Sequence, residues 1–304
     1  IKLDLDVVRS SYWRMNVKPT KKIDEYTFLY GDPEKDWHVM RLDPQTELYQ
    51  IVDRSAKPER TMADLEKEVE AQEKAVERYQ PAEASYAETV EAMKAFPDRA
   101  VPGGGVGINI NYREPLWLEA IALRPDLVRR TLAVQAERAA RACPVMARAG
   151  LRFIGGGGDF ASNSGPFYSP RAFHELTLPA LKKASDACHQ HGLFHMFASD
   201  GNLWPVADDL FGAAGVDAFY EIDGRAGMDL AKLRQRFPHL TLLGNISSFI
   251  LHRGTKAEVI AETRACLEAA KQYGSIIVGC SNQIVSQTPI ENFWAMMDTL
   301  HRYR

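Results

Sequence analysis

The sequence predicts an α/β protein with a parallel sheet, built as a (β/α)8 barrel. From residue 100 onward, short apolar stretches typical of buried strands alternate with longer helical patterns. About six such units follow one another at spacings of about 25 to 45 residues, as expected of parallel strands joined by helices. Polar side chains also gather at one end of these strands, the end that forms the binding face of such folds.

Size and composition restrict the class of protein. The 304 residues are 45% hydrophobic and 25% charged, which suits a single soluble barrel domain spanning residues 1–304. The net charge of −3 argues against a nucleic-acid partner or a basic membrane patch, and no apolar window has the ~20 residues of a membrane span. The four cysteines form no CxxC pair, so a reducing, cytoplasmic location is expected. Because the chain starts at Ile1 rather than Met, an N-terminal segment of the barrel is expected to be missing.

The first hundred residues differ from the rest. Apolar alternation at 26–30, 37–42 and 47–52 predicts antiparallel strands, so that residues 24–53 form an early hairpin excursion from the barrel. Helices are expected at 61–79 and 83–95.

The repeating part predicts strands at 103–110, 151–154, 193–198, 217–221, 240–245 and 275–279. The expected helices are 114–122, 125–148, 169–191, 203–213, 227–236, 255–272 and 289–302. A doubly wound sheet is the alternative. Against it, the glycine run at 155–158 leads into a long loop, and the next helix starts only at Ser169, so no GxGxxG turn opens a helix.

The strand ends predict a site. Groups that bind protons, metals or polar substrates follow nearly every strand: Asn109, Asn111, Asp159, Asp200, Glu221, Asp223, Asn245, Cys280 and Asn282. The opposite ends read as plain turns. In a barrel these side chains would meet in one mouth, whereas the simpler interpretation is that they cap and solvate loops.

Alternation along the strand at 193–198 separates Asp200 from His195. Phe194, Met196, Ala198 and Asp200 share one face, and His195 shares the other face with its neighbour at 197. If Asp200 faces the mouth, His195 faces the helices and is interpreted as a structural residue.

Several stretches resemble the uroporphyrinogen decarboxylase superfamily, which also contains corrinoid-dependent methyltransferases. They occur over about 200 residues in the order of that family: Asp159 with 164–170, 199–202, 215–217, 227–230, 243–246, 254–259 and 288–293. The resemblance implies a (β/α)8 barrel with an early hairpin, a small-molecule substrate, and a homodimer. It also implies that Phe167 and Tyr168, in the stretch 164–170, contact the substrate.

The departures from the family pattern matter for the chemistry. Zinc-dependent members carry His-x-Cys and a later Cys, and those positions here are Ala198, Asp200 and Asn282. A thiolate zinc site is therefore not expected, and any metal would be held by Asp200 with Cys280 or with Glu221. The decarboxylases have Gly-His-Gly around the position of Asn282, and they use several arginines for substrate carboxylates. Near the mouth the sequence offers only Arg113, Arg171 and Arg225, with Arg152 at the wrong end of its strand.

Three hypotheses remain. The first is a methyltransferase-like enzyme that passes a methyl group between a small methylated compound and a corrinoid on a partner protein, with no cofactor bound in this chain. Its catalytic residues would be Asp200 as the acid or base, Asp159 as a second carboxylate, and Glu221, which would orient the substrate. Asn109, Asn111, Asn245, Asn282 and Arg113 would bind substrate. The second is a decarboxylase-like lyase without a cofactor, and the third is a non-catalytic binding protein on the same barrel.

Overall fold

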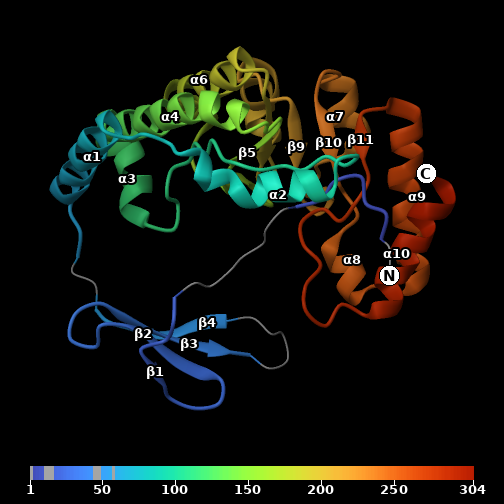
Figure 1. Cartoon of the computed structure of the whole chain (residues 1–304), viewed down its shortest axis with the longest axis horizontal. Coiled ribbons are helices and arrows are strands. Elements are labelled where there is room, and N and C mark those ends of the chain that lie inside the picture. Colours follow the sequence, from blue (N-terminus) through green and yellow to red (C-terminus); the bar gives the residue numbers. More distant parts are fainter. Residues whose placement is uncertain (1–2, 10–16, 44–48, 57–58) are drawn as a thin grey trace.

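A five-stranded parallel sheet forms the centre of the molecule (Figure 1). The computed structural model describes residues 3–9, 17–43, 49–56 and 59–304. The strands are β5 (Phe153–Gly157), β8 (Phe194–Ala198), β9 (Ala218–Tyr220), β10 (Thr241–Leu243) and β11 (Ile276–Ile277), and their spatial order is β11-β10-β9-β8-β5. Chain order and spatial order therefore run together, as in a barrel.

Two further segments extend the sheet beyond β5. The N–H groups of Gly103 and Val106 donate to the carbonyls of Phe153 and Gly155, at 2.9 Å each. The chain around Val7 in turn pairs with Ala100. The predicted strand at 103–110 is thus only an isolated bridge, because glycine favours regular strand structure weakly. Among the described residues the sheet does not close, so the complete barrel stays a prediction.

Helices pack around this sheet, most of them on one face, and the start of the second helix lines the cavity on the other face. They are α1 (Met62–Glu77), α2 (Ala87–Ala95), α3 (Pro115–Leu123), α4 (Pro125–Arg148), α5 (Pro170–Ala172), α6 (Leu178–Gln190), α7 (Leu230–Arg236), α8 (Ser248–Arg253), α9 (Lys256–Tyr273) and α10 (Ile290–Tyr303). Ile154, Phe197, Phe219 and Leu242 point toward them and are essentially fully buried. Alternate residues of the same strands point to the other face, which holds the site.

The helical layer also contains shorter or wider turns. These are η1 (Glu83–Tyr86), η2 (Phe173–Thr177), η3 (Trp204–Val206), η4 (Asp208–Ala213) and η5 (Gly224–Ala226), and a small ribbon pairs β6 (Ala161–Ser162) with β7 (Gly165–Pro166). None of the described helices combines the length and apolarity needed to cross a membrane.

An antiparallel sheet stands apart from this body (Figure 1, blue). It contains β1 (Lys21–Lys22), β2 (Thr27–Gly31), β3 (Trp37–Leu42) and β4 (Tyr49–Arg54), in that order. The sequence predicts strands close to β2, β3 and β4, although residues 47–48 of the third lie outside the described part. Every residue of β4 is exposed.

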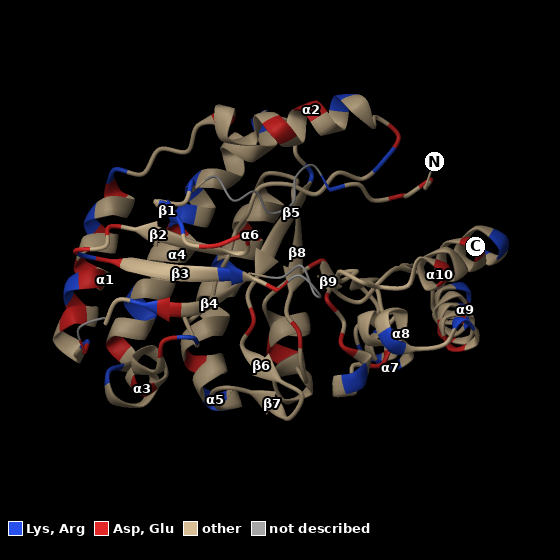
Figure 2. Ribbon diagram, turned by 90° about the horizontal axis from the view of Figure 1, so that it is seen from below, with Lys and Arg blue, Asp and Glu red and all other residues tan. Residues whose placement is uncertain are grey.

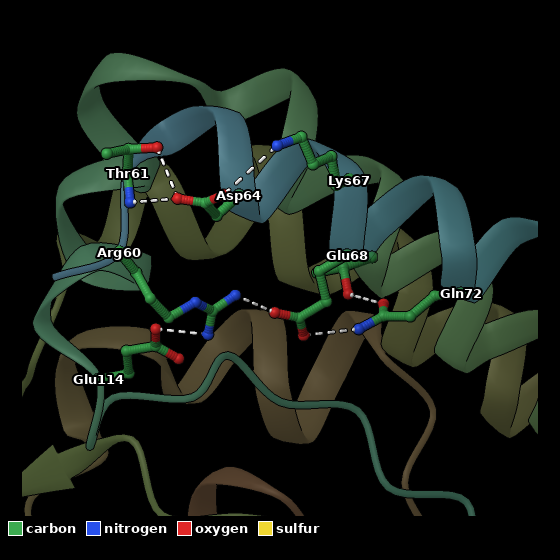
Figure 3. Close-up of polar contacts among 8 residues, drawn as sticks. Arg60, Thr61, Asp64, Lys67, Glu68, Gln72 and Glu114 are labelled. Carbon is green, nitrogen blue, oxygen red and sulfur yellow. Dashed lines mark hydrogen bonds and ion pairs between the residues drawn. The ribbon is translucent and has the colours of Figure 1, made fainter. Parts of the chain in front are cut away.

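Polar contacts fix the start of α1 (Figure 3). The Asp64 carboxylate accepts hydrogen bonds from the N–H and hydroxyl of Thr61, at 3.0 and 2.7 Å, as in a helix capping box. Arg60 bridges Glu68 on α1 and Glu114, which precedes α3. These contacts anchor α1 to the body where the chain leaves the antiparallel sheet.

Candidate active site

Three carboxylates converge where neighbouring strands end. Asp159 follows β5, Asp200 follows β8 and Glu221 follows β9, and each offers an oxygen within 4.8 Å of the others. Figure 2 shows these strands side by side, with acidic segments in red on the loops around their ends. The sequence predicts these three side chains at a common mouth, and the register of the sheet brings them together.

Glu221 reaches the cluster through an unusual backbone conformation. Tyr220 lines the open side of the sheet, so simple alternation would turn Glu221 toward the helices. Instead Glu221 has φ of 67°, in the left-handed region that few side chains other than glycine adopt. Such residues concentrate at functional sites, and here the turn lets consecutive side chains face the same space.

The cluster holds protons at neutral pH. Burial, and then the charges of Asp200 and Asp159, raise the pKa of Glu221 to about 7 against the opposing charge of Arg9. Burial also raises the pKa of Asp200, which is lowered in part by a hydrogen bond from Asn282. Glu221 is therefore a proton donor or acceptor suited to neutral pH.

Asn282, in the loop between β11 and α10, completes the cluster. Its Nδ2 donates to Oδ2 of Asp200 at 2.8 Å. The amide thus holds the carboxylate from a loop after β11, and the two lie 82 positions apart in the sequence. This contact gives Asn282 a partner in Asp200, and the substrate-binding role that the sequence predicts for it stays a prediction.

A cavity of about 930 Å³ opens beside the carboxylates. Its lining includes Gly105, Gly155, Met196, Tyr220 and Asn282. A second cavity of about 610 Å³ adjoins it, between residues 4–9 and β11, and shares Tyr220 and Asn282 with the first while adding Glu221. The carboxyl cluster therefore borders space large enough for a small-molecule ligand.

The other predicted amides have different surroundings. The backbone N–H and carbonyl of Asn109 pair with the Gln135 side chain, at 2.9 and 3.0 Å, which leaves the Asn109 amide on the open side. Asn111 is exposed beyond it. Asn245 donates to the Met228 carbonyl at 3.2 Å, so its amide supports a loop rather than the carboxylates.

The predicted aromatic and cationic contacts divide in the same way. Phe167 is partly exposed and stacks on Tyr112 with ring centres 4.8 Å apart, and Arg113 lies over the same Tyr112 ring at 5.6 Å. These three residues form an aromatic rim. Tyr168 is buried and its hydroxyl is 3.1 Å from that of Thr177, so it packs in the core behind the rim.

His195 faces the helices, as alternation predicts. It is fully buried, and its Nδ1 lies 2.8 Å from the Ser185 hydroxyl on α6. A methyl group on Gly156 would come within 2.2 Å of Nε2, so the imidazole fills the gap behind that glycine. Burial lowers the pKa of His195 to about 4, which keeps it neutral.

The donor atoms decide which metal the site would suit. Three carboxylates without thiolate or imidazole form a hard, oxygen-only set that favours Mg²⁺ or Ca²⁺ over zinc. Within the described part of the chain, Cys280 is not a member of any such ligand group. The residues at this mouth therefore do not fit the thiolate zinc site of the methyltransferases.

Two residues of the site escape sequence reasoning. Arg9 lines both cavities and its charge acts on Tyr220 and Glu221, yet the first strand has too little pattern to reveal it. Tyr220 could be found from alternation, because it shares a strand face with Ala218.

A parallel sheet with ionisable groups gathered at the carboxyl ends of its strands is an arrangement typical of α/β enzymes. The family model "Uroporphyrinogen decarboxylase (URO-D)" matches residues 115–303. The chain belongs to this family of enzymes, as the motifs predict.

Among solved structures, a methyltransferase from Methanosarcina mazei is similar, with a TM-score of 0.56 and 21% identity over 71% of this chain. The alignment covers 64% of that protein, so this chain spans less than two thirds of its length. A chitinase from Chromobacterium violaceum aligns with a TM-score of 0.43 and 10% identity over 73% of this chain and 85% of the chitinase. No curated protein matches the sequence.

Proposed function

We propose that this chain is a methyltransferase-like enzyme that passes a methyl group from a small methylated compound to a corrinoid carried by a separate protein, or in the reverse direction. The observation that carries the proposal is the carboxyl cluster with Glu221, whose pKa of about 7 keeps a transferable proton next to an open cavity. The relationship to a family that includes such enzymes supports it.

The chemistry requires one proton. When the bond between the methyl carbon and its oxygen or nitrogen breaks, the electron pair stays on that heteroatom while the methyl group goes to cob(I)alamin as co-substrate. Protonated Glu221 donates to the heteroatom and becomes a carboxylate, and solvent restores the proton. Burial, with the charges of Asp200 and Asp159, keeps Glu221 protonated beforehand, and Asn282 orients Asp200.

Charge at the mouth argues against a substrate with many carboxylates. Three carboxylates repel such a compound, and binding it would require several converging cations. Arg171 pairs with Glu175 and is largely exposed, and Arg225 lies over the Phe249 ring at 4.1 Å. Arg171 and Arg225 are thus engaged elsewhere. Arg9 and Arg113 lie near the mouth, where these two arginines face three carboxylates, and this balance favours methyl transfer over porphyrinogen decarboxylation.

A decarboxylase-like reaction is the second candidate because the matching family is described by that activity. A neutral carboxyl such as Glu221 could protonate an electron-rich ring carbon after loss of CO₂. A binding protein without catalysis is the third.

The test combines methyl donors with free cob(I)alamin and follows methylcobalamin by its absorbance. Methylated phenols, amines and thiols serve as donors, and CO₂ release from porphyrinogens is measured in parallel. Methylation by at least one donor, lost in Asp200→Asn but retained in Glu268→Gln on the exposed side of α9, is the expected result. If no donor methylates cob(I)alamin and CO₂ is released instead, the second candidate replaces the first.

A further inference from the structure

Among the described residues, the inner face of the sheet borders a cavity where a barrel of this class is normally filled by side chains. Barrel interiors are packed by layers of bulky branched side chains. Here the positions facing inward include Gly155, Met196 and Tyr220, and the neighbouring segment contributes Gly105. The result is the cavity of about 930 Å³, near the upper end of the range for small-molecule sites.

The cavity runs along the strands. Its lining begins at Pro102 and Gly103, where the first inner segment starts, and continues to Cys280 and Asn282 at the ends of the last strand. Asn282 also contacts Asp200, so one end of the hollow meets the carboxyl cluster. An elongated molecule would lie with its polar end at the mouth and its remainder inside.

Two glycines leave this space open, although the backbone conformation at neither position requires a glycine. Neither Gly105 nor Gly155 has a positive φ. A methyl group on Gly105 would come no closer than 3.9 Å to another atom, and on Gly155 no closer than 3.7 Å, which are ordinary contact distances. A side chain at either position is therefore compatible with the fold, and what its absence provides is volume.

Neighbouring glycines show the contrast. A methyl group on Gly156 would clash with His195 at 2.2 Å, and Gly157 has φ of 102° with Ala198 at 2.1 Å. Those two are required by packing and backbone geometry. Gly105 and Gly155 instead line a cavity to which Met196, Tyr220 and Leu243 contribute apolar surface, and Arg9, Ser85, Glu88 and Thr89 line other parts of it.

We propose that the inner face of this sheet binds the apolar portion of an elongated small molecule, an alkyl or aryl chain, and that Gly105 and Gly155 set the length and width it accepts. That this molecule is the substrate rests on the proposed function, whereas the binding itself does not.

The experiment measures binding without turnover. Wild-type protein is titrated with N-phenyl-1-naphthylamine, a neutral probe whose fluorescence rises in apolar surroundings. We expect saturable binding to one site per chain. Gly155→Leu and Gly105→Leu should each weaken it at least about tenfold, because the added carbons occupy the space of the probe. Gly155→Ala should retain binding, and so should Gly212→Leu, which alters an exposed glycine without a positive φ.

A second measurement needs no variant. Linear alcohols from butanol to decanol should displace the probe with an affinity that rises about fourfold per methylene, until the chain fills the hollow. Absence of saturable probe binding, or affinities independent of chain length, would overturn the inference. So would leucine variants that are folded by circular dichroism and bind the probe as tightly as wild type.

The two proposals fail separately. Protein that binds the alcohols but methylates nothing refutes the proposed methyl transfer and leaves the apolar site standing. Protein that transfers methyl groups but ignores chain length refutes the apolar site alone.

Discussion

Replacing Glu221 with glutamine should make the protein more stable at alkaline pH. The pKa of Glu221 in the folded protein, about 7, lies above the ordinary value of 4.5. The folded state thus binds more protons than the unfolded state between these values, so its stability falls as pH rises from 4.5 through 7. Glutamine resembles the protonated acid and removes that loss.

The size of the effect follows from the same shift. At 1.36 kcal/mol per pKa unit, the difference corresponds to roughly 3.4 kcal/mol above pH 8 as a ceiling. Because Glu221 is only partly buried, solvent screens some of the interaction, and an increase of about 1–2 kcal/mol is expected. Below pH 4.5 the variant and wild type should agree within about 0.5 kcal/mol.

Urea unfolding at pH 4.5 and pH 8, followed by circular dichroism, measures both values. Glu268→Gln is the matched control, since it changes an exposed glutamate and should shift the free energy of unfolding by less than about 0.5 kcal/mol at either pH. A Glu221→Gln variant that is no more stable than wild type at pH 8 would refute the assignment of a buried, charge-crowded acid.

Four further outcomes are expected. Asp200→Asn should lower methyl transfer at least about 100-fold in a cob(I)alamin assay, because a carboxylate of the cluster is lost whose charge, together with burial, favours protonated Glu221. Asn282→Ala removes a hydrogen bond that lowers the pKa of Asp200, so the pH–rate profile should move upward, with a loss of about tenfold at pH 7. The pKa of His195 in the folded protein, about 4, lies below the ordinary 6.5, so wild type loses stability as pH falls from 6.5 to 4, by up to roughly 3 kcal/mol. His195→Gln should remove this loss, which thermal or urea unfolding across that pH range measures. Millimolar Mg²⁺ or Ca²⁺ should inhibit turnover at pH 7. Calorimetry that compares binding of the ions to wild type and to Asp200→Asn tests whether they act at this cluster.

The sequence predicts most of the architecture because strand and helix periodicities are local. Alternation places Met196 and Asp200 on one face and His195 on the other, and the structure agrees. The same reasoning cannot predict that Glu221 turns into the site, since a left-handed residue after β9 depends on packing around the loop. It also misses the direction of the Asn245 amide, which is determined by a carbonyl 17 residues away.

The carboxyl cluster can serve as an acid or as a tight cation site, but not as both at once. A proton donor at pH 7 requires that the charged form of Glu221 be unfavourable, and burial beside Asp159 and Asp200 provides this. A bound divalent cation would favour the charged forms and remove the proton. In the zinc-dependent relatives the residues corresponding to Ala198 and Asp200 are metal ligands by resemblance, whereas here a small side chain and a carboxylate occupy those positions. Under the proposed function, proton transfer takes the place of metal chemistry at this mouth. The inhibition expected from Mg²⁺ or Ca²⁺ and the stability gained in Glu221→Gln would both follow from a cluster that favours the protonated form of Glu221.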